Sequence, residues 1–199
     1  MTIEPKEMHL RFEYINIKEK NEILGKASSV SEDELLKYFI SENQTFSIGN
    51  YLLVAEDITQ RLTSNLRKYM EPRDVNLMRL GLREIIINAI EHGNLNISFR
   101  EKSEAINENR YFQFVAARQH DPEYSSKRIY IEYSVAPDKV TYRVKDEGKG
   151  FNHHTLHSAD NELSHGRGII MTKNIFDEVE YNEKGNEVTL VKHFSWNKG

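Results

Sequence analysis

The chain has 199 residues, with 27 Lys and Arg side chains against 31 Asp and Glu, and it contains no cysteine. The lack of cysteine excludes a disulfide scaffold, a thiolate zinc site and a thiol nucleophile, and it is typical of a reducing compartment. We expect a cytoplasmic protein without a membrane partner, because no apolar run reaches the roughly 18 residues of a membrane span. A net charge of −4 predicts no general attraction to nucleic acid.

The first 45 residues are predicted to form an N-terminal extension. Residues 8–17 alternate apolar with polar side chains, which indicates a strand. Ser31 and Glu34 have the spacing of a capping box ahead of apolar residues and predict a short helix over 32–42. No repeat or low-complexity tract interrupts the rest, so we expect one domain over 46–199.

Helical spacing dominates the next part of the chain. Residues 46–48 indicate a short strand, and residues 51–70 carry apolar side chains at helical intervals. The most regular helix is predicted between Asp74, as its N-cap, and Gly93, as its end.

The helix predicted over 74–93 carries two faces. Glu84, Asn88 and His92 form a polar stripe beside Gly81 when residues are placed at 100° steps. A Glu and an Asn four residues apart are most often a solvated pair. Alternatively, both point into one site, where the amide oxygen binds Mg²⁺ and the carboxylate polarises a nucleophile. The apolar face comprises Val75, Met78, Leu82, Ile85, Ile86 and Ala89.

Two-residue periodicity predicts strands in the second half of the chain. Residues 129–135 and 140–144 indicate an antiparallel hairpin, and strands are also predicted over 178–181 and 187–194. An apolar segment over 169–176 is long enough for a helix. Together these elements predict an α+β two-layer sandwich, with a mostly antiparallel mixed sheet and helices on one face.

The hairpin ends in an acidic and glycine-rich sequence. Asp146 continues its apolar side, where a carboxylate without a partner costs free energy. Asp146, Gly148 and Gly150 are typical of a tight turn, because glycine accepts positive φ angles. Alternatively, Asp146 accepts a hydrogen bond from an exocyclic amine such as that of adenine, and the glycines let the backbone approach the base.

A second glycine pair precedes the last predicted helix. Gly166 and Gly168 flank Arg167, a pattern that is often only a flexible loop end. The amides and dipole of a helix N-terminus also suit a polyphosphate, and Arg167 would add positive charge. The order of the three clusters along the chain is more specific than any cluster alone.

In this order, the clusters resemble the GHKL ATPase superfamily, and more closely its anti-sigma-factor serine/threonine kinases. The resemblance spans about residues 46–194 and implies a Bergerat-type ATP-binding fold. It rests on Leu-Arg-Glu84-Ile-Ile-Ile-Asn88-Ala-Ile-Glu-His-Gly, Val-Lys-Asp146-Glu-Gly148-Lys-Gly150-Phe and His-Gly166-Arg-Gly168-Ile-Ile-Met, which match the N-box and the two glycine boxes.

The resemblance implies a role for each matching residue. Glu84 would be the general base, Asn88 the Mg²⁺ ligand and Asp146 the acceptor for the adenine of ATP, assisted by Thr189. Residues 152–165 would form a mobile lid over ATP. The remaining glycine-box residues would line the base (Gly148, Gly150) or meet the phosphates (Gly166, Arg167, Gly168).

Four histidines in the expected lid suggest a metal site as one alternative. No carboxylate or histidine stands at a spacing that completes a tetrahedral shell, so solvated loop side chains are the favoured interpretation. The four are His153, His154, His157 and His165.

Two regions depart from the family pattern and could carry partner specificity. They are the first 45 residues and the stretch over 101–128, which is longer than the family pattern needs. The sequence over 94–128 is charged and irregular apart from a predicted helical patch at 111–117.

The resemblance implies an ATP- and Mg²⁺-dependent protein kinase. It would phosphorylate a serine or threonine of a small antagonist (anti-anti-sigma) protein and bind a sigma factor when that protein is absent. It also suggests a homodimer. The alternative is a nucleotide-binding module that docks a protein partner without turnover.

Overall fold

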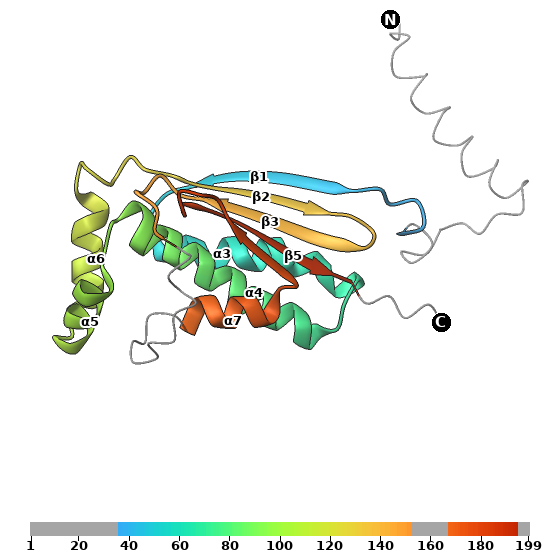
Figure 1. The fold of residues 1–199 in the computed structure, drawn as a ribbon, viewed down its shortest axis with the longest axis horizontal. Helices are drawn as coiled ribbons and strands as arrows, with labels where there is room; N and C mark the ends of the chain where they lie inside the picture. The colour runs from blue at the N-terminus through green and yellow to red at the C-terminus, as the bar shows by residue number, and fades with distance from the viewer. Residues whose placement is uncertain (1–35, 153–166, 195–199) are drawn as a thin grey trace, which may run out of the picture. The chain divides into compact units, whose positions relative to one another are not determined.

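A five-stranded sheet and a layer of helices form the fold in the computed structural model, which describes residues 36–152 and 167–194 (Figure 1). Each strand is hydrogen-bonded to its neighbours in antiparallel fashion, in the order β1-β2-β3-β5-β4. The strands are β1 (Glu42–Ile48), β2 (Ile129–Val135), β3 (Lys139–Lys145), β4 (Glu178–Tyr181) and β5 (Glu187–His193).

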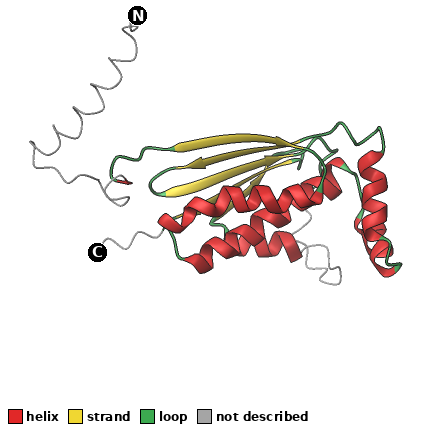
Figure 2. Cartoon of the chain, turned by 180° about the vertical axis from the view of Figure 1, so that it is seen from behind, coloured by secondary structure: helices red, strands yellow, loops and turns green. Residues whose placement is uncertain are grey.

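The helices pack against one face of this sheet (Figure 2). Figure 1 shows α3, α4 and α7 running along that face, with α5 and α6 at one end of it. These helices are α3 (Leu52–Thr63), α4 (Pro72–Asn88), α5 (Phe99–Asn107), α6 (Tyr111–His120) and α7 (Arg167–Ile175). A 3-10 segment η1 (Ser64–Lys68) follows α3, and a π-helical segment η2 (Ala89–Asn94) follows α4.

Alternating side chains of the central strands form the sheet side of the core. In β2 and β3, every second residue is buried, while the residues between them are largely exposed. Tyr142 is fully buried in β3, and its hydroxyl donates to the carbonyl oxygen of Leu62 at 3.2 Å. Each buried Val or Ile side chain of these strands contributes about 1.5–3 kcal/mol to stability. The predicted α+β sandwich with helices on one face is therefore confirmed.

Several predicted boundaries differ from the structure. Strand β1 begins at Glu42, so no helix extends to residue 42; the rest of that predicted helix and the strand predicted over 8–17 lie outside the described residues. Helix α4 begins at Pro72 with Glu71 as its N-cap, and Asp74 lies in its first turn. Proline suits the first helical position because its missing N–H would have no partner there. Gly93 does not end the helix, which continues as η2 to Asn94.

Helix α5 is absent from the sequence-based assignment of 94–128. Its N-terminus carries a complete capping box, in which Ser98 accepts from the backbone N–H of Glu101 and Glu101 accepts from that of Ser98. This Ser-x-x-Glu signal was present in the sequence, but the high charge of the segment obscured it. Helix α6 confirms the predicted helical patch and extends it to His120. The proposed division into 1–45 and 46–199 stays a prediction.

Candidate functional site

The polar stripe of α4 lies beside its buried face. Glu84 and Asn88 are half-buried, and the amide Nδ2 of Asn88 donates to Oε1 of Glu84 over 3.4 Å. The apolar residues predicted for the other face of this helix are all buried. The amide oxygen of Asn88 has no hydrogen-bond partner among the described residues, so it remains available as a ligand.

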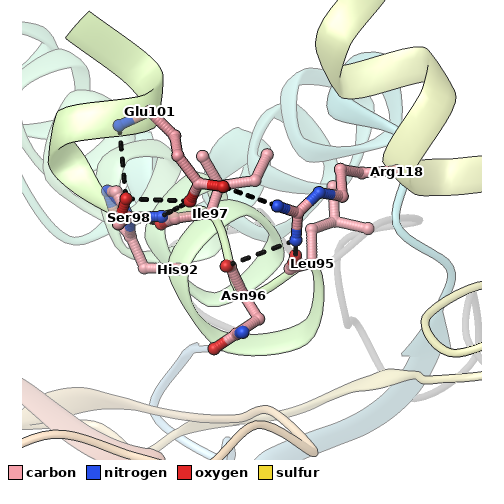
Figure 3. Close-up of polar contacts among 7 residues, drawn as sticks. All are labelled: His92, Leu95, Asn96, Ile97, Ser98, Glu101 and Arg118. Carbon is pink, nitrogen blue, oxygen red and sulfur yellow. Dashed lines mark hydrogen bonds and ion pairs between the residues drawn. The ribbon is translucent and has the colours of Figure 1, made fainter.

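His92, the third residue of the predicted stripe, contacts its own loop. Its Nδ1 lies 2.6 Å from the carbonyl oxygen of Ile97 (Figure 3). The centroid of its ring lies 4.0 Å from that of Phe99. Burial lowers the pKa of His92, which favours the neutral ring with Nδ1–H as the donor. This arrangement fixes the loop after η2.

The backbone at the start of α7 contacts Glu84. A Cβ atom on Gly168 would lie 2.7 Å from Cγ and 2.8 Å from Cδ of Glu84, so a larger residue there would displace the Glu84 side chain from its present position. The structure therefore brings the second glycine box to the N-box. Gly166 and residues 153–165 of the predicted lid lie outside the described residues, as does the side chain of Arg167.

Asp146 lies at the end of β3 with only 8% of its surface exposed. The N–H of Gly148 donates to its Oδ1 at 2.7 Å, and no described residue donates to its other oxygen. Burial raises the pKa of Asp146 to about 6, although the Gly148 hydrogen bond and the charges of Lys184 and Lys127 oppose that shift. The burial of Asp146 agrees with its place on the apolar side of the hairpin.

The end of the long helix meets the Asp146 turn through glycine. A Cβ atom on Gly93 would lie 2.6 Å and 2.7 Å from the two carboxylate oxygens of Asp146, and one on Gly148 would lie 2.6 Å from the carbonyl carbon of Gly93. Gly93 follows Glu84 by nine positions, which corresponds to about 13.5 Å at 1.5 Å per residue. Glu84 and Gly93, the residue that approaches Asp146, thus lie on one continuous helical segment.

Two buried asparagines hold this turn in place. Oδ1 of Asn94 accepts from the backbone N–H of Glu147 at 2.8 Å, and its Nδ2 donates to Oδ1 of Asn50 at 2.8 Å. The Nδ2 of Asn50 in turn donates to the carbonyl oxygens of Tyr124 and Lys127 at 2.9 Å and 3.2 Å. Sequence reasoning missed both asparagines, because a single Asn near an element end is usually a solvated turn residue.

Thr189 does not join this group. It pairs with Arg143 and Glu180 in the sheet, and it alternates with buried residues that face the helices. Side chains alternate between the faces of a strand, so Thr189 points away from the helix layer and from the side on which Asp146 contacts Gly93. The prediction that Thr189 assists Asp146 therefore requires correction.

Asn186 occupies the place that was expected for Thr189. It is buried, its Nδ2 donates to the carbonyl oxygen of Asp146 at 2.7 Å, and its own carbonyl oxygen accepts from the N–H of Asp146 at 2.9 Å. Gly150 lies against the β4–β5 turn. Its φ is +77°, and a Cβ atom there would overlap the carbonyl of Lys184. The β4–β5 turn thus supports the Asp146 loop from the sheet side.

Two further properties concern the described part of the chain. There, no group of three or more His, Cys, Asp or Glu side chains could hold a metal ion. None of the helices described is both long enough and apolar enough to span a membrane.

Comparison with known proteins identifies the domain. The model of the histidine kinase-like ATPase domain matches residues 53–192, which is more than half of the chain, and this range contains the site from Glu84 to Asp146 and Gly168. No curated protein matches the chain significantly. The match bears out the predicted superfamily and indicates ATP binding. The chain therefore belongs to the histidine kinase-like ATPase domain family.

Proposed function

We propose that the chain is an ATP- and Mg²⁺-dependent protein serine/threonine kinase of the anti-sigma-factor kind, acting in the cytoplasm. Its substrate would be a small antagonist protein, and its other partner a sigma factor. The observation that carries this proposal is that Glu84 lies on α4 and that Asp146 lies against Gly93, nine positions further along the same helical segment, with each carboxylate beside a glycine backbone. This arrangement suits a ligand with a base at one end and a polyphosphate at the other.

The Asp146 end fits an adenine ring. One oxygen of this buried carboxylate has no donor among the described residues, and the exocyclic amine of adenine would supply one. Guanine presents a carbonyl oxygen at the same position, which would face the carboxylate unfavourably. Gly93 and Gly148 carry no side chain that could obstruct the base.

The Glu84 end fits the phosphates and the metal ion. The amide nitrogen of Asn88 faces Glu84, which leaves its oxygen for a hard cation such as Mg²⁺. The backbone at Gly168 opens α7, where helix amides favour an anion. When bound, MgATP supplies the phosphoryl group for transfer.

Glu84 is suited to accept a proton during this transfer. Among the described residues, its carboxylate forms no ion pair, and Asn88 is its one hydrogen-bond partner. The acceptor hydroxyl would lose its proton to Glu84 while its oxygen forms a bond to the γ-phosphorus. The bond between that phosphorus and the bridging oxygen breaks, and ADP leaves with the electron pair.

Incubation with γ-labelled ATP, Mg²⁺ and cell lysate tests the proposal. We expect acid-stable label on a small protein, because phosphoserine and phosphothreonine survive acid. The same reaction without the purified chain is the control. If the chain binds ATP but labels no protein, it is instead a nucleotide-binding module that acts by docking a partner.

A further inference from the structure

Helices α5 and α6 are joined to the site by a buried acidic residue that the proposed reaction does not use. Glu91 lies in η2, between Asn88 and Gly93, and none of its side chain is exposed. Its Oε2 accepts from Nζ of Lys102 in α5 at 2.5 Å, and its Oε1 accepts from the hydroxyl of Tyr111 in α6. A buried carboxylate needs such partners, because removing a charge from water is costly.

The Tyr111 hydroxyl responds to the same cluster. Burial and the Glu91 carboxylate both raise the pKa of Tyr111, so its hydroxyl stays protonated and remains a donor at all physiological pH values. Helices α5 and α6 thus each provide one donor to the same carboxylate. This contact ties both helices to η2.

A second contact fastens the chain just after η2. Nη1 of Arg118 in α6 donates to the carbonyl oxygen of Leu95 at 3.1 Å, and its Nη2 donates to Oε1 of Glu101 at 2.7 Å (Figure 3). Glu101 also completes the capping box of α5. The turn between η2 and α5 is therefore held from both helices.

The π-helical geometry of η2 matters for the site. Its backbone closes with a hydrogen bond from the N–H of Leu95 to the carbonyl oxygen of Ile90 at 2.9 Å, which spans five residues instead of four. A π-helical turn such as this one, at the end of an α-helix, is rarer and less favourable than a further turn of α-helix. Here it presents Gly93 to the carboxylate of Asp146 and Asn94 to the N–H of Glu147.

We propose that Glu91 is a positioning residue for base recognition, which holds η2 in its π-helical form against the Asp146 turn through Lys102 and Tyr111. The effect on nucleotide selectivity rests on the proposed function. The positioning itself does not, because it concerns contacts within the protein. The α5–α6 pair thereby sets how sharply the site distinguishes adenine from guanine.

Tyr111→Phe tests this proposal with the smallest change, and Glu91→Gln tests it more severely. Calorimetric titrations of each full-length variant with ATP and with GTP give the ratio of the two dissociation constants. The loss of one hydrogen bond corresponds to about a three- to tenfold change. We expect the preference for ATP to fall by that factor in Tyr111→Phe and further in Glu91→Gln.

Val135→Ala is the matched control. Val135 is buried at the opposite end of β2, so the variant loses thermal stability without changing the Asp146 turn. It should melt at a lower temperature and keep the selectivity of the original chain. If all three variants lose stability but none loses selectivity, Glu91 is only structural and the proposal is wrong.

Amide hydrogen exchange separates this proposal from the proposed function. The amides of Glu147 and Gly148 donate to Asn94 and Asp146, so they report on the turn in the absence of nucleotide. Both amides should exchange faster in Tyr111→Phe than in the original chain. In Val135→Ala their exchange rates should be unchanged. A chain that binds no nucleotide but shows this pattern refutes the function and supports the positioning role. Unchanged exchange in Tyr111→Phe refutes the positioning role.

Discussion

Glu84→Gln is expected to reduce phosphotransfer by about 10²- to 10⁴-fold, which is the usual contribution of a general base. ATP affinity should stay nearly unchanged, because glutamine keeps the shape of the side chain and can accept a hydrogen bond from Asn88. Single-turnover transfer of labelled phosphate, measured beside calorimetric ATP binding, separates the two effects.

Glu56→Gln provides the control for this prediction. Glu56 pairs with Arg83, the neighbour of Glu84, at 2.7 Å, and both side chains are exposed. Surface pairs of this kind contribute little to stability, so the control should retain full activity. Equal turnover by Glu84→Gln and the original chain would rule out the proposed role of Glu84.

Asp146→Asn is expected to weaken ATP binding by roughly ten- to a hundredfold. A hydrogen bond to a charged acceptor is worth about 1.5–3 kcal/mol, and each 1.4 kcal/mol is a factor of ten in affinity. The NH₂ group of the asparagine could also face the exocyclic amine of adenine, and two hydrogen-bond donors cannot pair with each other. Glu147→Gln is the control, since Glu147 binds the backbone N–H of Arg128 at 2.7 Å and should leave affinity intact. Wild-type affinity in Asp146→Asn would refute base recognition by Asp146.

The raised pKa of Asp146 adds a dependence on pH. Its carboxyl titrates at about 6 in the folded chain, against an ordinary value of 3.8. Only the ionised carboxylate accepts the amine strongly, so ATP affinity should fall as pH drops below about 6. The phosphates of ATP titrate in the same pH range. Affinity is therefore measured against pH for both the original chain and Asp146→Asn, and the part of the pH dependence that the variant lacks is due to Asp146.

Stability should change with pH in the opposite direction. Between pH 3.8 and about 6 the folded chain binds more protons at Asp146 than the unfolded chain does. The contribution of Asp146 is therefore fully present at acidic pH and is lost as pH rises through 6. Chemical denaturation of Asp146→Asn should lack this component.

The fold was predictable where one periodicity ran undisturbed. The β2–β3 hairpin and the buried face of α4 follow directly from alternating and helical spacing. Helix α5 was missed, since its apolar content is low and Ala105 is its one buried residue. The π-helical turn of η2 was not predictable, because it depends on tertiary contacts such as those of Glu91.

The residue types of the site could be predicted from the sequence, but the contacts that hold them in place could not. Glu84, Asn88 and Asp146 are residue types that suit a nucleotide. The structure places the first two on α4 and Asp146 against Gly93, near the end of the same helical segment. Thr189 was misassigned because β5 alternates, and the register that turns it away from Asp146 is not visible in one sequence. Asn186 gave no signal beyond its place in a turn.

An NMR titration of the full chain with MgATP tests the central claim most directly. The amides of Gly93 and Gly148 report on the Asp146 end, and that of Gly168 reports on the Glu84 end. We predict that all three signals shift together, with one dissociation constant, as a single nucleotide binds. Shifts at one end alone, or two separate binding curves, would contradict the claim that these patches form one site.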